Sequence, residues 1–295
     1  MFIKDFLQID PKDISEKITE FMKEKVEAFD REGVIMGLSG GIDSSCVAVL
    51  AVKALGPDKV FGLLMPEQDS SKESVEYANL LARELGIKTQ LVNHTPILEK
   101  WGIYDLLSNQ EWEMAKAAFT FRRGPEAQNV FMRAQLGIKP KRLRKLFAYI
   151  NIKHRVRSIT HYYYAEQMNY LVAGTTNKST NLTGLTVKYG GVADIMPLKN
   201  LYKTQIKVLS EFIGVPRPIL ERAPSPDLFP GFTDLSVLGM EFDQLDIILV
   251  GLERGVPRKL IVKEAGITED DVERISELIM LTEHKRNLPE VPVLY

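Results

Sequence analysis

The residues with the clearest chemical potential form one short stretch, Gly37-Leu-Ser-Gly-Gly-Ile-Asp-Ser-Ser45. The stretch follows the apolar run 34–38 and leads directly into the apolar run 46–51. This order predicts a strand, a glycine-rich turn and the start of a helix. Unpaired backbone amides and the positive end of a helix dipole meet at such a turn, and together they bind anions. We therefore predict a phosphate site here.

Individual side chains refine this prediction. Gly40 and Gly41 let the backbone approach phosphate oxygens closely. Asp43 would repel a polyphosphate unless a cation lay between them, so we interpret it as a magnesium ligand. The less specific alternative is an ordinary strand-to-helix turn that is rich in small residues. The turn also carries three hydroxyl donors, on Ser39, Ser44 and Ser45.

The spacing distinguishes this turn from the common nucleotide loops. It lacks the Gly-Lys-Ser/Thr ending of the nucleotide P-loop, and it is not Gly-x-Gly-x-x-Gly. It fits Ser-Gly-Gly-x-Asp-Ser, a pattern that resembles the pyrophosphate loop (PP-loop) of the ATP pyrophosphatases. Those enzymes split ATP into AMP and pyrophosphate while they activate a carboxyl or carbonyl group. The resemblance therefore implies ATP and magnesium as ligands.

Alternating strands and helices must position the turn. Apolar runs predict four strands, at 34–38, 60–65, 89–93 and 170–174. Helical periodicity predicts helices that include 13–29, which starts at a capping box, 72–85, 152–168 and 203–213. This alternation predicts an α/β fold with a doubly wound parallel sheet flanked by helices, whose ligands gather beyond the carboxyl ends of the strands. The polar turn 175–181 should face the same crevice as the first turn.

Length and composition favour one large unit. The chain has 295 residues, 45% of them hydrophobic, so we expect a single α/β domain over 1–295. It would carry a helical, basic insertion at about 101–150 and a helical C-terminal part at about 234–290. No apolar run approaches the roughly 20 residues of a membrane span, and no signal peptide is visible. The single cysteine, Cys46, excludes an internal disulfide, fits the core of the helix after the turn, and indicates a reducing cytoplasm.

Charge is unevenly distributed along the chain. Between positions 122 and 157 there are eleven lysines and arginines and one acid, Glu126. We expect this segment to present a positive surface. Such a surface could bind the phosphates of a nucleotide or of RNA, or it could be a solvated helical face.

Short motifs in a fixed order extend the resemblance to the whole chain. They are Asn151-Ile-Lys-His-Arg-Val-Arg157, Gly174-Thr-Thr-Asn-Lys178, Lys188-Tyr-Gly190, Leu201-Tyr-Lys-Thr-Gln205, Pro224-Ser-Pro-Asp-Leu228 and His284-Lys285. With the phosphate turn, this set resembles the NAD synthetase family over most of 10–290, apart from 101–150. The resemblance implies a homodimer that binds ATP and nicotinate adenine dinucleotide (deamido-NAD). Such an enzyme adenylylates the nicotinate carboxylate and lets ammonia displace AMP.

The resemblance also implies roles for particular residues. The ATP-binding positions match Ser39, Gly40, Gly41, Asp43, Ser44, Ser45, Thr175, Lys203 and Ser225. The positions that hold the dinucleotide match Arg155, Tyr162, Lys188, Asp194, His284 and Lys285. The alternative is that the basic members of this second set are surface charges, with His284 and Lys285 forming an ordinary basic helix end.

The chain departs from the family pattern at two places. The family has a glutamate six residues after the glycine at 174, as a second magnesium ligand, where this chain has Thr180. The family also has Lys-x-Gly-Asp-Gly-Gly, where this chain reads Lys188-Tyr-Gly-Gly-Val-Ala-Asp194. A hydroxyl is a much weaker magnesium ligand than a carboxylate. Either another acid completes the metal site, or the acyl substrate differs.

Together these observations predict a cytoplasmic, ammonia-dependent carbon–nitrogen ligase of the NAD synthetase type. We expect it to use ATP and magnesium, to form a homodimer, and to have no membrane or nucleic-acid partner. One alternative is a PP-loop ligase that amidates another carboxylic acid. A second is a tRNA-modifying PP-loop enzyme, which the basic segment suits, although the chain lacks paired cysteines and an appended RNA-binding module. A third is a non-catalytic nucleotide-binding or scaffold protein.

Overall fold

A computed structural model of the chain describes residues 2–113, 141–191, 193–222, 235, 238–287, 289, 291–292 and 294. The N-terminal elements are η1 (Ile3–Leu7), α1 (Pro11–Ala28), β1 (Gly33–Gly37), α2 (Ile42–Leu55), η2 (Pro57–Lys59), β2 (Val60–Leu64), α3 (Lys72–Leu85), β3 (Lys88–Leu91) and α4 (Thr95–Lys100). The later elements are α7 (Lys141–Met168), β4 (Tyr170–Val172), α8 (Lys178–Leu182), α9 (Lys203–Phe212), α10 (Arg217–Leu220), α12 (Phe242–Glu253), α13 (Arg258–Ala265), α14 (Glu269–Leu281) and η3 (Glu283–Lys285).

The sheet has four parallel strands in the order β3-β2-β1-β4. Val34 of β1 lies opposite Val60 of β2 on one side and Leu171 of β4 on the other. The strand order therefore reverses at β1, which confirms the predicted doubly wound parallel sheet. In such sheets the crevice at the reversal, beyond the carboxyl ends of the strands, is the ligand site. The glycine-rich turn leaves β1 at this point.

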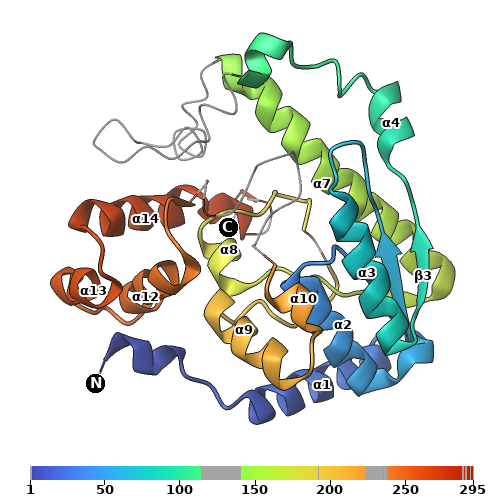
Figure 1. Ribbon diagram of the computed structural model, residues 1–295, viewed down its shortest axis with the longest axis horizontal. Helices are drawn as coiled ribbons and strands as arrows, with labels where there is room; N and C mark the ends of the chain where they lie inside the picture. Colours follow the sequence, from blue (N-terminus) through green and yellow to red (C-terminus); the bar gives the residue numbers. More distant parts are fainter. Residues whose placement is uncertain are drawn as a thin grey trace.

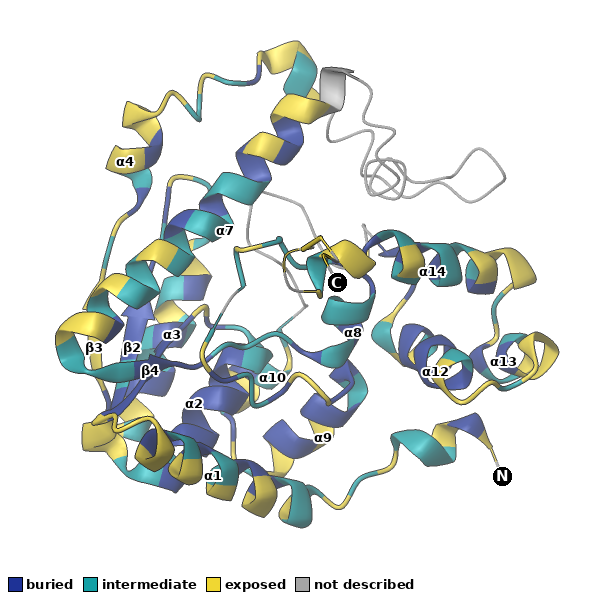
Figure 2. Ribbon diagram, turned by 180° about the vertical axis from the view of Figure 1, so that it is seen from behind, coloured by how far each residue is buried: buried dark blue, intermediate teal, exposed yellow. Residues whose placement is uncertain are grey.

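Helices cover both faces of the sheet (Figure 1). The first face packs against α1, α2, α3 and α9, and the second packs against α7. Helix α2 is apolar from Cys46 to Val52, and this part is largely buried between the sheet and its neighbouring helices (Figure 2). Cys46 is fully buried there, and burial raises the pKa of its thiol to about 12. The interpretation of Cys46 as a core residue agrees with this position.

Two predicted helix boundaries were wrong. The predicted capping box at Asp13 is not the start of α1, because Asp10 is the N-cap and accepts from the amide of Lys12 at 2.9 Å, with Pro11 in the first helical position. The helix expected at 152–168 begins earlier, because α7 runs without a break from Lys141 and no glycine or proline interrupts it.

The C-terminal helices build a second core. Helices α12, α13 and α14 pack together and against η1 and the first half of α7. Helix α12 also contacts α8 and α9, so these helices reach the ligand edge of the sheet (Figure 1). Among the described residues, no helix combines the length and the apolar character needed to cross a bilayer.

A buried ion network removes one lysine, Lys153, from the predicted basic surface. Lys153 is fully buried, and its Nζ lies 3.1 Å from a Glu67 oxygen and 2.5 Å from an Asp69 oxygen. Tyr104 donates to Glu67 at 2.8 Å, and Tyr149 donates to Asp69. Lys153 therefore links α7 to the loop after β2 through ion pairs, and its side chain does not face solvent. Within the described part of the segment, Lys145 is half-exposed and pairs with Glu111.

We expect Lys153→Met to lower the free energy of unfolding by about 3–5 kcal/mol, because two buried carboxylates lose their cation. Urea denaturation followed by circular dichroism measures this change. Lys145→Met is the matched control on the same helix, and it should leave the midpoint near the wild-type value because its ion pair is exposed. A Lys153→Met protein as stable as the wild type would contradict the assignment.

Candidate active site

The phosphate turn is shaped by close packing against α3. Gly40 has φ +69°, a left-handed conformation that favours glycine. A Cβ at this position would lie 2.4 Å from the carbonyl oxygen of Ser74. Side chains larger than hydrogen are excluded for both reasons, so the glycine in the motif is required by the fold.

The serine hydroxyls stabilise the turn from within. Ser44 and Ser45 donate to the carbonyl of Gly41 at 3.0 and 2.9 Å. Ser39 Oγ lies 3.0 Å from Ser44 Oγ and accepts from the amide of Gly41 at 3.3 Å. In this structure the three hydroxyls therefore hold the shape of the turn.

Asp43 lies at the start of α2 between two polar partners. Lys203 Nζ, from the first turn of α9, lies 2.5 Å from Asp43 Oδ2. Asn177 Nδ2, at the start of α8, donates to Asp43 Oδ1 at 3.2 Å. About a quarter of the Asp43 side chain is exposed. A cation and a carboxylate thus stand together beside the predicted phosphate site.

Asp246, from the C-terminal part of the chain, links the two helices at whose starts these partners lie. It is fully buried on α12 and accepts from Ser179 Oγ of α8 at 2.5 Å. It also accepts from the amide and the hydroxyl of Thr204 in α9, each at 2.8 Å. Burial raises the pKa of Asp246 to about 6. The sequence analysis missed this residue, and the signal that could have found it is a lone acid beside the apolar run 247–252.

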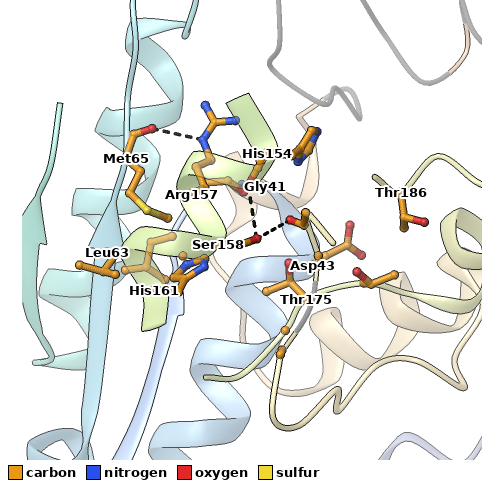
Figure 3. Close-up of a pocket in the computed structure, with 18 of the residues that line it drawn as sticks. Gly41, Asp43, Leu63, Met65, His154, Arg157, Ser158, His161, Thr175 and Thr186 are labelled. Carbon is orange, nitrogen blue, oxygen red and sulfur yellow. Dashed lines mark hydrogen bonds between the residues drawn. The ribbon is translucent and has the colours of Figure 1, made fainter. Parts of the chain in front are cut away.

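A cavity of about 330 Å³ adjoins the turn. Its walls come from the turn, the end of β2, α7, the polar turn after β4 and the loop 185–193 (Figure 3). Four threonines line it, Thr175, Thr176, Thr180 and Thr186, and Asp43 is the one acid among the described lining residues. Arg222 also lines it, and donates to the Gly40 carbonyl at 3.2 Å and to Ser74 Oγ at 2.8 Å. Arg222 was not predicted.

Two of the residues matched to substrate binding, Arg155 and Lys285, contact the loop 184–190, which itself carries a third, Lys188. Arg155 Nε donates to the carbonyl of Lys188 at 3.3 Å. Lys285 Nζ donates to the carbonyls of Gly184 and Thr186 at 2.6 and 3.0 Å. His284 precedes Lys285 in η3. These contacts attach the C-terminal end of the chain to the cavity wall.

Tyr162 and Asp194 form a separate pair. Tyr162 donates to Asp194 Oδ1 at 3.2 Å, and the amide of Val172 donates to Asp194 Oδ2 at 2.8 Å. Neither residue lines the cavity within the described chain. Asp194 therefore does not replace the missing carboxylate beside Asp43 in this structure. Ser225 lies outside the described residues.

The position where the family has a glutamate is close to Asp43. Thr180 Oγ1 lies 3.1 Å from Asn177 Oδ1, and the amide nitrogen of the same Asn177 side chain donates to Asp43. Nowhere in the described ranges do three or more histidines, cysteines, aspartates or glutamates form a metal-binding group. Of the lining residues that the structure describes, Asp43 alone offers a carboxylate to a cation here.

Comparison with known proteins decides the family. The sequence matches the NAD synthase family over residues 14–132 and 126–289. The chain belongs to this family. Among NAD synthases, the NH3-dependent NAD(+) synthetase of Methanocaldococcus jannaschii is 39% identical over 281 residues, covering 95% of this chain and 96% of that protein. The enzyme of the same name from Thermotoga maritima is 38% identical, covering 94% and 98%.

Solved structures of NAD synthases and related enzymes share the fold. An NMN synthetase from Francisella tularensis superposes with a TM-score of 0.72 at 26% identity, over 97% of this chain and 99% of that one. An NH3-dependent NAD synthetase from Campylobacter jejuni has a TM-score of 0.71 at 25% identity, over 97% and 100%. The resemblance found from the sequence motifs is therefore confirmed at the level of family and fold.

Proposed function

We propose that the chain is an ammonia-dependent NAD synthetase, a carbon–nitrogen ligase that uses ATP to convert nicotinate adenine dinucleotide to NAD. The observation that carries the proposal is the Asp43–Lys203 pair beside the phosphate turn, at the reversal of the sheet and next to a cavity. The NH3-dependent NAD(+) synthetases that are 38–39% identical to the chain support it.

The chemistry suits these residues. A nicotinate oxygen attacks the α-phosphorus of ATP, and pyrophosphate leaves. Ammonia then attacks the carbonyl carbon, and AMP leaves with the oxygen that joined them while the nitrogen loses a proton. Charge builds on the departing pyrophosphate, and the Lys203 ammonium with the amides of the turn stabilises it.

Magnesium fits the donors that are present. This ion is commonly held by one or two carboxylates together with substrate phosphates and water. Asp43 supplies one carboxylate, and Thr180 adds a hydroxyl on the same cavity wall. When bound, magnesium neutralises charge on the phosphates. The Asp43 carboxylate would then bind the metal and share less of its contact with Lys203 Nζ.

The acyl substrate would lie along the other cavity wall. We propose that Arg155, Lys188, His284 and Lys285 bind its phosphates and that Tyr162 and Asp194 contribute from the adjoining pair. Because an NMN synthetase shares the fold over nearly its whole length, a mononucleotide acid is the second candidate substrate. The chain departs from the family pattern at Thr180 and at 188–194, and these departures are a reason to test the mononucleotide acid as a substrate.

Pyrophosphate release with a panel of acids tests this function. The purified chain receives ATP, magnesium and ammonium, and then nicotinate adenine dinucleotide, nicotinate mononucleotide, other carboxylic acids or tRNA. We expect the dinucleotide to give the fastest release and glutamine to replace ammonium poorly, because the one cysteine is buried in α2. Release that depends on another acid or on tRNA would replace the NAD assignment.

The metal site gives a separate prediction. We expect Thr180→Glu to lower the magnesium concentration for half-maximal rate by about tenfold, because a second carboxylate strengthens a hard-cation site. Thr180→Gln is the matched control, with similar length and no charge. An unchanged magnesium requirement in Thr180→Glu would mean that an acid outside the described residues already completes the site.

We also propose that the enzyme is a cytoplasmic homodimer. Ile159 and Tyr163 lie one helical turn apart on α7 and are 64% and 57% exposed, so they offer an apolar stripe to a second copy. The single, buried cysteine suits a reducing compartment. Sedimentation equilibrium, with Ile159→Arg as the disrupting variant, tests the dimer.

A further inference from the structure

One polar atom on the cavity wall has no partner. His161 lies on α7, and its Nε2 is shielded from solvent and makes no hydrogen bond to any described residue. Two neighbouring side chains on this helix do have hydrogen-bond partners. Ser158 donates to the Gly190 carbonyl at 2.8 Å, and Arg157 donates to the Met65 carbonyl at 3.3 Å. A shielded nitrogen without a partner is unfavourable. It therefore points to a ligand that satisfies it.

The His161 ring lies at the end of the cavity away from Asp43, beside Leu63 and Met65 (Figure 3). Gly37, the last residue of β1, makes room for it. A Cβ at Gly37 would lie 2.9 Å from His161 Nε2 and 3.2 Å from Met65 Cε. Nε2 therefore lies against the end of β1, in the part of the cavity wall that Gly37 and His161 form together.

The ring is neutral at physiological pH. Burial, together with the nearby Arg157 cation, lowers the pKa of His161 to about 4. A neutral imidazole has one nitrogen that accepts a hydrogen bond. This end of the cavity therefore combines apolar side chains with an uncharged hydrogen-bonding atom, a setting that suits the flat ring of a nucleobase.

The next step rests on the proposed function, which places the phosphates of ATP at the glycine-rich turn. The base of that nucleotide then extends towards the apolar walls formed by Leu38, Leu64 and Met65. We propose that His161 Nε2 accepts a hydrogen bond from the 6-amino group of adenine, which makes His161 a specificity-determining residue for the base. Guanine and hypoxanthine carry an oxygen at that place, and two acceptors would then face each other.

Calorimetric titration with two nucleotides tests this role without turnover. The probes are ATP and purine riboside triphosphate, which lacks only the 6-amino group, both with magnesium and without an acyl substrate. We expect the wild type to bind ATP about tenfold more tightly than the analogue, the effect of one hydrogen bond to a shielded group. His161→Leu should bind the two alike, and His161→Gln should keep a preference because its amide oxygen accepts.

His154→Leu is the matched control, since His154 lies two turns earlier on the same helix and also lines the cavity. His154→Leu should change the affinities for ATP and for the analogue by the same factor. A His161→Leu protein that still prefers ATP would overturn the inference. The inference would also be overturned if His161→Leu and His161→Gln each lowered the affinities for ATP and for the analogue by the same factor. A wild type that binds ATP with no preference overturns only this inference, whereas one that binds no ATP overturns the proposed function as well.

Discussion

Asp43→Ala is expected to lower the rate of pyrophosphate release by at least about a hundredfold, the order of loss seen when one electrostatic partner of a transition state is removed. Asp43 supplies the one carboxylate among the described residues that line the cavity. Without it, none of the described lining residues offers a carboxylate to magnesium. The measurement is a coupled pyrophosphate assay at saturating ATP and acyl substrate.

Two further variants sharpen this result. Asp43→Asn keeps the size of the side chain and should lose nearly as much activity as the alanine variant, because the charge is what the metal requires. Asp13→Ala removes an exposed carboxylate that also pairs with a lysine, Lys17 at 2.7 Å, and it should leave the rate unchanged. An Asp43→Ala enzyme with near-normal turnover would disprove the assignment of the phosphate turn.

Lys203→Met is expected to reduce kcat by about a hundredfold with a smaller effect on the KM for the acyl substrate, because the ammonium acts where charge develops on the leaving pyrophosphate. The variant also removes the cation that lies 2.5 Å from Asp43. Lys203→Arg should recover part of the rate, since it keeps the charge but not its position.

The matched control for Lys203 is Lys178→Met. Lys178 lies on the neighbouring α8 and binds Glu253 at 2.6 Å, outside the cavity lining that the structure describes. The Lys178→Met variant should therefore keep a rate close to that of the wild type. Thermal unfolding of both variants separates a catalytic loss from a loss of folded protein. A Lys203→Met enzyme with wild-type kcat would contradict the role of the lysine in stabilising the leaving pyrophosphate.

The parts of the site that are local in sequence were predictable. The phosphate turn follows from a strand, a glycine-rich turn and a helix that are contiguous, so the residues 37–45 carry the whole signal. The parallel sheet was predictable for a similar reason, because strands and helices alternate along the chain. The matches of Thr175 and Lys203 to ATP binding depended on family resemblance rather than on spacing.

Long-range contacts were not predictable from local patterns. Asp246 is 67 residues from Ser179 in sequence, and Arg222 is 182 residues from Gly40. Lys153 looked like one more surface charge until the structure placed Glu67 and Asp69 around it. In each case the partner comes from another element, so a polar residue near an apolar run gives a signal without indicating what it binds.

The transfer of oxygen from the acid to AMP tests the central claim most directly. Nicotinate adenine dinucleotide labelled with ¹⁸O in both carboxylate oxygens is incubated with ATP, magnesium, ammonium and the enzyme, and the products are analysed by mass spectrometry. Adenylylation of the carboxylate predicts one ¹⁸O atom in each AMP, one in the amide of NAD and none in pyrophosphate. Unlabelled AMP, or labelled orthophosphate formed together with ADP, would contradict the account.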